Sequence, residues 1–218
     1  MRYWNWIKEA VFPARCIICK REGDWLCSKH DQFELAPKNE AQFDSLDEIF
    51  AATAYYHDTS RKLVEYFKFR GFAELADIMA QQMILVLPID QLKSYTIVPV
   101  PLHWTRKLWR GFNQAEKLSI ALQKKFPDIK ISTDLKRVRR TQQQARLKRN
   151  ERFSNLKQAF VWQGEDIPQK ILLVDDVIAS GSTLDAAAAC LKNKEVTHVS
   201  GVVFARGGKQ CQNSINET

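Results

Sequence analysis

The 218-residue chain has no long apolar segment, no internal repeats and no low-complexity stretch. No apolar run approaches the roughly 20 residues that a membrane-spanning helix needs. The first twelve residues include Arg2, Lys8 and Glu9, and they contain neither the apolar core nor the small-residue cleavage site of a signal peptide. We therefore expect a soluble, cytoplasmic protein that does not insert into a membrane.

Cysteine is also scarce, and the five cysteines are an odd number, which does not suit a disulfide framework. Three of them lie close together, in the spacing Cys16-x2-Cys19 followed by Cys27-x2-His30. Two tight turns of this kind bring four nitrogen and sulfur ligands to one point, as a tetrahedral Zn²⁺ site requires. The predicted ligands are Cys16, Cys19, Cys27 and His30. The alternatives are buried thiols beside a surface histidine, or Cys211 as the fourth ligand, whereas Cys190 is expected in the core.

With 45% hydrophobic and 11% aromatic residues, the chain can form one full domain with a small appendage. We expect strands at residues 49–56, 95–101, 170–175 and 196–205, and helices at 3–11, 59–69, 72–87, 114–126 and 183–192. This alternation predicts an α/β fold in which a parallel sheet carries helices on both faces. We place a helix, zinc module and linker at 1–45, the α/β domain at 46–206 and a disordered tail at 207–218.

The most informative segment is KILLVDDVIASGSTL at residues 170–184. A buried strand is expected to end in Asp175 and Asp176, followed by a turn and a helix. The turn offers free backbone N–H groups and the hydroxyls of Ser180, Ser182 and Thr183, which together form a phosphate cradle. Gly181 allows the backbone to approach a ligand closely. The two acids can accept hydrogen bonds from vicinal hydroxyls or act on Mg²⁺.

This segment resembles the phosphoribosyl pyrophosphate (PRPP) signature of type I phosphoribosyltransferases. Residues 12–206 as a whole are similar to the ComF competence-protein family, in which a zinc finger precedes a phosphoribosyltransferase domain. Three further segments carry the resemblance: VPVPL at 98–102, RGFNQ at 110–114, and Thr141-x2-Gln144-x2-Leu147-x4-Arg152-x2-Asn155.

The resemblance implies roles for individual residues. Asp175 and Asp176 would hold the ribose hydroxyls and, with Arg110, form the catalytic set. The 5′-phosphate would bind at Ala179, Ser180, Gly181, Ser182 and Thr183. Pyrophosphate would face Pro99, Val100, Lys68, Arg106 and Lys107. Residues 139–155 correspond to a flexible loop that closes over the substrate.

The same resemblance implies a phosphoribosyltransferase that binds PRPP with Mg²⁺, carries a structural Zn²⁺ and uses an unidentified acceptor. Ala179 stands where the family commonly has Thr, which removes one hydroxyl from the phosphate site. Purine phosphoribosyltransferases usually carry an acid at that place, so its absence argues against purine salvage.

Basic residues concentrate in one segment. Residues 104–152 hold 15 Lys/Arg and 4 Asp/Glu, a local charge of +11 that leaves the rest of the chain at −3. The segment fits a solvated loop, an electrostatic funnel for PRPP, or a groove for single-stranded DNA in which Trp104, Trp109 and Phe112 stack on bases.

Two functions therefore remain open. The preferred one is a PRPP-binding phosphoribosyltransferase-like protein of natural competence and DNA uptake. The other is a zinc-containing single-stranded DNA-binding or adaptor protein, a partner of the competence machinery, with a vestigial or regulatory PRPP site.

Overall fold

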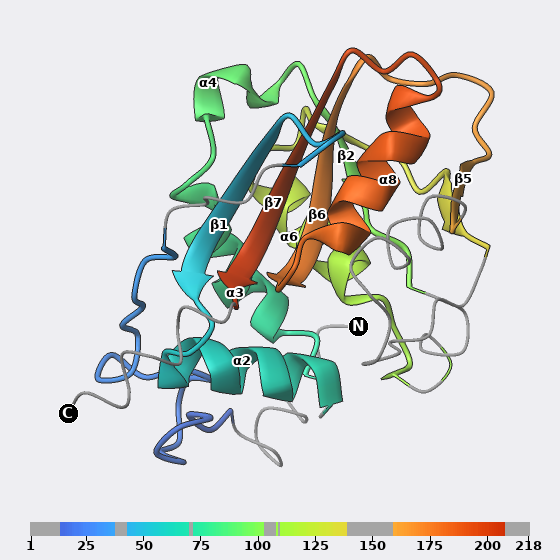
Figure 1. Ribbon diagram of the computed structural model, residues 1–218. Coiled ribbons are helices and arrows are strands. Elements are labelled where there is room, and N and C mark those ends of the chain that lie inside the picture. Colours follow the sequence, from blue (N-terminus) through green and yellow to red (C-terminus); the bar gives the residue numbers. More distant parts are fainter. Residues whose placement is uncertain are drawn as a thin grey trace, which may run out of the picture.

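The computed structural model describes residues 14–37, 43–69, 72–102, 108, 110–138 and 159–207. Within them lies a five-stranded sheet of order β1-β7-β6-β2-β3, parallel throughout (Figure 1). Its strands are β1 (Glu48–Ala54), β2 (Thr96–Pro99), β3 (Lys130–Ile131), β6 (Lys170–Ile178) and β7 (His198–Arg206). The helices are α2 (Asp58–Phe69), α3 (Leu75–Ile84), α4 (Ile89–Leu92), α6 (Gln114–Lys125) and α8 (Ser182–Lys192). The predicted α/β class is confirmed.

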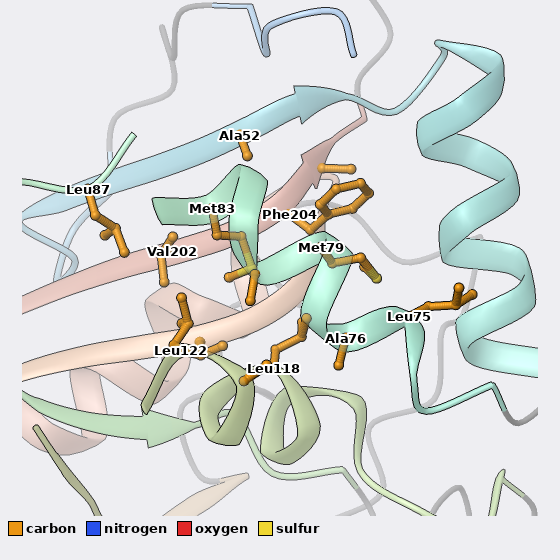
Figure 2. Close-up of a cluster of buried hydrophobic side chains, with 14 of the residues drawn as sticks. Ala52, Leu75, Ala76, Met79, Met83, Leu87, Leu118, Leu122, Val202 and Phe204 are labelled. Carbon is orange, nitrogen blue, oxygen red and sulfur yellow. The ribbon is translucent and has the colours of Figure 1, made fainter. Parts of the chain in front are cut away.

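The sheet is buried on both faces, which explains why β6 is a continuous apolar run in the sequence. Ile171 and Leu173 face the cluster that contains α8, whereas Leu172 and Val174 face the cluster that contains α2, α3 and α6. Figure 2 shows the second cluster. Its labelled side chains come from β1, α3, α6 and β7 and from Leu87 just after α3.

The four predicted helices between residues 59 and 192 and the four predicted strands are found within a few residues of their expected bounds, but three short strands were missed. These are β3 and the antiparallel ribbon of β4 (Leu135–Arg137) with β5 (Phe160–Trp162). Two or three residues are too few for a period-two pattern to emerge. The expected end of the 170–175 strand was also wrong, because β6 keeps pairing with β7 as far as Ile178. The two acids thus lie within a strand.

A topological switch point, where the crossovers change direction along the sheet, lies between β2 and β6; we call this place the crevice. The chain leaves β2 through α6 to reach β3 and leaves β6 through α8 to reach β7, in opposite directions along the sheet. The two helices consequently cover opposite faces, and ligands of open α/β sheets bind at such a switch point. The pairing of β2 with β6 ends at Pro99 and Val174, one residue before Asp175. Helix α2 lies beyond the ends of β1 and β7 (Figure 1).

Part of the expected linker packs against the edge of the sheet. The backbone N–H of Ala54 donates to the carbonyl of Glu34 at 2.8 Å, and Leu35 forms a bridge with Thr53. This segment thereby covers the exposed edge of β1. The domain boundary at residue 45 stays a prediction, and the expected helix at 3–11 lies outside the described residues, as does the tail from 208. No described helix is long and apolar enough to cross a membrane.

Candidate functional site

The four predicted zinc ligands come together in the structure. The side-chain ligand atoms of Cys16, Cys19, Cys27 and His30 all lie within 4.8 Å of one another. His30 Nδ1 is 3.6 Å from Cys16 Sγ and 3.2 Å from Cys27 Sγ, and the sulfur atoms of Cys19 and Cys27 are 3.8 Å apart. Ligand atoms around a tetrahedral Zn²⁺ are separated by roughly 3.5–3.8 Å, given its bond lengths. The cluster therefore fits a zinc ion. Cys211 lies outside the described residues.

Two tight turns build the cluster. Lys20 N–H donates to the carbonyl of Cys16 at 2.8 Å, and His30 N–H donates to the carbonyl of Cys27 at 2.8 Å. Lys20 adopts a positive φ of 65°, which lets the first turn reverse the chain. Each turn thus brings its first ligand back toward its second.

Electrostatics within the cluster favour a bound cation. Burial raises the pKa of the Cys16 thiol, but the backbone N–H groups of Cys19, Cys27 and Ile18 outweigh it and bring that pKa from 9.0 to about 6. Loss of hydration and the two neighbouring thiols raise the pKa of Cys27 above 9.0. The first thiolate, at Cys16, therefore forms readily, whereas its neighbours oppose ionisation of the Cys27 thiol. A divalent metal would remove this repulsion, since thiolates are the form that ligates it.

The cysteine module, residues 14–31, which carries these four residues, packs against α2 and the segment that follows it. Lys20 Nζ donates to Tyr66 Oη at 2.6 Å, and Thr59 Oγ1 donates to the carbonyl of His30 at 3.4 Å. The rings of Trp25 and Phe72 lie 4.7 Å apart between centroids. The module therefore shares an interface with the helix that carries Lys68.

The second site lies where β2 stops pairing with β6. Asp176 is buried, and its Oδ2 atom is 3.1 Å from Lys68 Nζ at the end of α2. The Asp175 side chain keeps part of its surface exposed, and its Oδ1 atom accepts the backbone N–H of Asp176 at 2.9 Å. Three of the residues predicted from the sequence thus meet at one place.

The carboxyl group of Asp175 has a raised pKa. Loss of hydration, followed by the repulsion of Asp176, raises the pKa of Asp175 from 3.8 to about 7, although Lys68 and Arg137 act in the opposite direction. Between about pH 4 and pH 7, the folded chain retains a proton on Asp175 that the unfolded chain has released. The contribution of Asp175 to the free energy of unfolding therefore falls as the pH rises from about 4 to about 7.

We predict that Asp175→Asn stabilises the protein at pH 8 and has much less effect at pH 4. The asparagine carbonyl can still accept the Asp176 N–H, while the buried charge is gone. The gain at pH 8 should be roughly 2–4 kcal/mol, at about 1.4 kcal/mol for each pKa unit. Urea unfolding at both pH values measures it. Asp166→Asn, at an exposed acid, is the matched control, and an equal effect of Asp175→Asn at the two pH values would contradict the assignment.

The predicted phosphate cradle follows β6 directly. Gly181 adopts φ 75° and ψ −5°, the left-handed conformation that glycine tolerates best, and α8 begins at the next residue. Ala179 and Ser180 are exposed, and the hydroxyls of Ser180 and Ser182 are 2.9 Å apart. Thr183 lies in the first turn of α8 and is partly exposed. The backbone N–H groups at this helix start have no partner in the preceding turn of helix, which suits an anion.

The predicted pyrophosphate side is ordered by Asn113. Its Oδ1 atom caps α6 by accepting the Ala115 N–H at 3.1 Å, and its Nδ2 atom donates to the carbonyl of Val100 at 3.2 Å. Val100 N–H donates to the carbonyl of Val174 at 2.9 Å, so the segment after Pro99 stays beside β6. Asn113 was not singled out from the sequence, although its place before an amphipathic helix is a capping signal.

Arg110 packs against the last residue of α2, Phe69. Its guanidinium carbon is 5.4 Å from the centroid of the Phe69 ring, and Nη1 donates to Gln114 Oε1 at 3.3 Å. Phe69 follows Lys68 in the chain, so Arg110 packs against the end of the helix that carries Lys68. Arg106 and Lys107 lie outside the described residues, as does the predicted flexible loop at 139–155.

Arg137 was missed as an individual residue, because the sequence interpretation treated the whole basic segment alike. It is the last residue of β4, where Val138 N–H donates to the carbonyl of Ala159 at 2.8 Å. Its positive charge acts to lower the pKa of Asp175, against the larger effects of lost hydration and Asp176. The described residues on either side of 139–158, Val138 and Ala159, are thereby hydrogen-bonded to each other.

Residues 108–216 match the phosphoribosyl transferase domain family. The chain is 33% identical to Competence protein F of Haemophilus influenzae over 153 residues, which cover 66% of this chain and 67% of that protein. It is 29% identical to Competence protein ComFC of Bacillus subtilis over 64% of this chain and 56% of that protein. It is 31% identical to the DNA utilization protein YhgH of Escherichia coli O157:H7 over 62% of each chain, so the match covers less than two thirds of the last two relatives.

Proposed function

Because this chain belongs to the ComF family of phosphoribosyltransferase-domain proteins, we propose that it binds PRPP as a magnesium complex between β2 and β6 and acts in DNA uptake during natural competence. The observation that carries the proposal is the pair formed by Asp176 and Lys68, with Asp175 beside it and the Gly181 turn after it. The competence role rests on the relatives named competence protein and DNA utilization protein.

The ribose hydroxyls would donate hydrogen bonds to the carboxylates of Asp175 and Asp176. The 5′-phosphate would lie against the backbone N–H groups and hydroxyls of residues 180–183, at the positive end of the α8 dipole. PRPP has its pyrophosphate on the opposite side of the ribose from this phosphate. The cationic side chains of Lys68 and Arg110 are suited to the pyrophosphate.

In the transfer step, the bond between ribose C1 and a pyrophosphate oxygen would break, and a bond from C1 to the acceptor would form. The ribose then passes through an oxocarbenium-like state while negative charge accumulates on pyrophosphate. Lys68 and Arg110 would stabilise that charge, and magnesium would share it as part of the substrate complex. The carboxylates of Asp175 and Asp176 would hold the ribose in place while the bond to pyrophosphate breaks and the bond to the acceptor forms.

We also propose that Cys16, Cys19, Cys27 and His30 hold a structural zinc ion. A module of this size has little core of its own, so the metal would contribute much of its folding free energy.

Isothermal titration calorimetry with PRPP and Mg²⁺ tests the binding proposal. The wild-type protein should bind, and Lys68→Gln should weaken binding about 10- to 100-fold, the value of a lost hydrogen bond to a charged group. Lys62→Gln is the matched control, because Lys62 lies on the same helix and pairs with the exposed Asp58 instead. Absence of PRPP binding by the wild-type protein, or equal losses in the two variants, would contradict the proposal.

The second candidate is a single-stranded DNA-binding protein whose PRPP site is regulatory or vestigial. The +11 charge of residues 104–152 favours it, since cationic segments bind nucleic-acid phosphates. An arm of the same calorimetry with an oligothymidylate separates the two. DNA binding without PRPP binding supports the second candidate.

A further inference from the structure

A short segment outside the matched phosphoribosyltransferase region, residues 43–47, crosses the start of α8. We call these residues the strap. The ring of Phe43 occupies the space beside Gly181, where an added Cβ atom would lie only 2.2 Å from Phe43 Cε1. Ile178 Cδ1 lines the same space at 3.2 Å. The bare backbone of the predicted phosphate turn therefore rests on the Phe43 ring.

A buried carboxylate ties the strap to the same helix. Asp185, only 3% exposed, accepts the backbone N–H groups of Ser45 at 2.9 Å and Leu46 at 3.2 Å through Oδ1. The Asp185 N–H donates to the carbonyl of Gly181 at 2.9 Å, which closes the first turn of α8. One residue thus joins the strap to the turn that would hold the phosphate.

The far end of the strap is anchored to the sheet. Asp47 Oδ2 accepts the Val199 N–H at 2.7 Å and pairs with Lys192 Nζ at 2.7 Å. Leu46 is buried in the cluster that also holds Leu184. The strap is therefore fixed at both ends, between the α8 start and the start of β7.

The phosphate turn has little support of its own. Ala179 and Ser180 are exposed, and the side-chain hydrogen bonds of the turn are local: the hydroxyls of Ser180 and Ser182 are 2.9 Å apart, and Ser182 N–H donates to Ser180 Oγ at 3.5 Å. Anion-binding turns work when their N–H groups are held in place before the ligand arrives, and small displacements cost much affinity. The apolar support beneath Gly181 comes from Phe43 and Ile178.

We propose that Phe43 and Asp185 are positioning residues that hold turn 179–183 in the conformation that binds the 5′-phosphate of PRPP. The inference rests on the proposed PRPP function and extends it to a part of the chain outside residues 108–216. The strap acts on the phosphate turn alone. The proposed pyrophosphate position is on the β2 side of the site and would not contact residues 43–47.

The test compares the two ends of PRPP as separate competitors. PRPP is bound to the protein with Mg²⁺, and ribose 5-phosphate or inorganic pyrophosphate is titrated in to displace it. Phe43→Ala should lower the affinity for ribose 5-phosphate at least about tenfold and change the affinity for pyrophosphate less than about twofold. Such a selective loss is expected when one subsite loses its preorganisation. Asp185→Ala should have the same selective effect.

Conservative variants separate positioning from general stability. Phe43→Leu retains an apolar side chain under Gly181, and Asp185→Asn retains an acceptor oxygen for the strap, so both should recover most of the ribose 5-phosphate affinity. Equal losses for both competitors in Phe43→Ala, or unchanged ribose 5-phosphate affinity, would overturn the inference while leaving PRPP binding intact. A wild-type chain that binds no PRPP would overturn the proposed function and this inference together.

Discussion

Replacing Asp175 and Asp176 together by alanine is expected to lower the affinity for PRPP at least about 100-fold. Each carboxylate would accept a hydrogen bond from a ribose hydroxyl, and each such bond to a charged group is worth about 1.5–3 kcal/mol. Two of them together give about 3–6 kcal/mol, and each 1.4 kcal/mol is about tenfold in affinity. Calorimetry with PRPP and Mg²⁺ measures the change.

Glu165 and Asp166 supply the matched control for this substitution. They are also adjacent acids, but both are exposed and precede the start of β6 at Lys170, whereas Asp175 lies further along that strand. Alanine at both positions changes the net charge equally and should leave PRPP affinity within about twofold, since exposed charges at a distance are screened. Thermal unfolding confirms that each variant is folded, and Asp175→Asn with Asp176→Asn serves if the alanine variant is not. Retained PRPP binding in a folded variant would remove these acids from the site.

Loss of one zinc ligand is expected to remove the metal and unfold residues 14–31. The wild-type protein should contain about one zinc ion per chain, and Cys27→Ser should contain almost none. Zinc contributes about 10–16 kcal/mol to isolated finger peptides, far more than the contacts of Lys20 and His30 with α2 and of Trp25 with Phe72 can replace. Metal analysis gives the stoichiometry, and limited proteolysis reports whether the module has opened.

Cys190→Ser is the control for the zinc prediction. Cys190 is a half-buried thiol on α8, within the apolar cluster of that helix and away from the four ligands. Its replacement should leave the zinc content at about one per chain and the module resistant to protease. Zinc retained by Cys27→Ser, or lost equally from both variants, would show that the cluster is not the metal site.

The fold was largely predictable because its signals are local. Strand β6 is apolar on both faces, and α8 begins directly after Gly181 within the Ser/Gly/Ser/Thr segment, so a few neighbouring residues identify each element. The error at the end of β6 has a long-range cause. Its last residues pair with β7, and nothing within residues 175–178 encodes that partner.

The candidate site likewise has features set by neighbouring residues, which could be predicted, and features set by distant residues, which could not. The spacing of Cys16, Cys19, Cys27 and His30 predicted a cluster that the structure assembles, because each pair of ligands is brought together by a single tight turn. The pairing of Lys68 with Asp176 could be expected only through a family resemblance. The electrostatic effect of Arg137 on Asp175 could not be expected, since Arg137 is placed by a two-stranded ribbon too short to be recognised.

The sequence by itself determined the parts of this protein whose geometry is set within a few consecutive residues: the metal-binding turns, the buried strands and the phosphate turn at Gly181. Only the tertiary structure decided which distant residues serve those parts. The strap contacts Asp185 across 140 positions of the chain, and its hydrogen bonds use backbone N–H groups that every non-proline residue possesses. Such partners leave no mark in the sequence, because strand order and the directions of the crossovers bring them together.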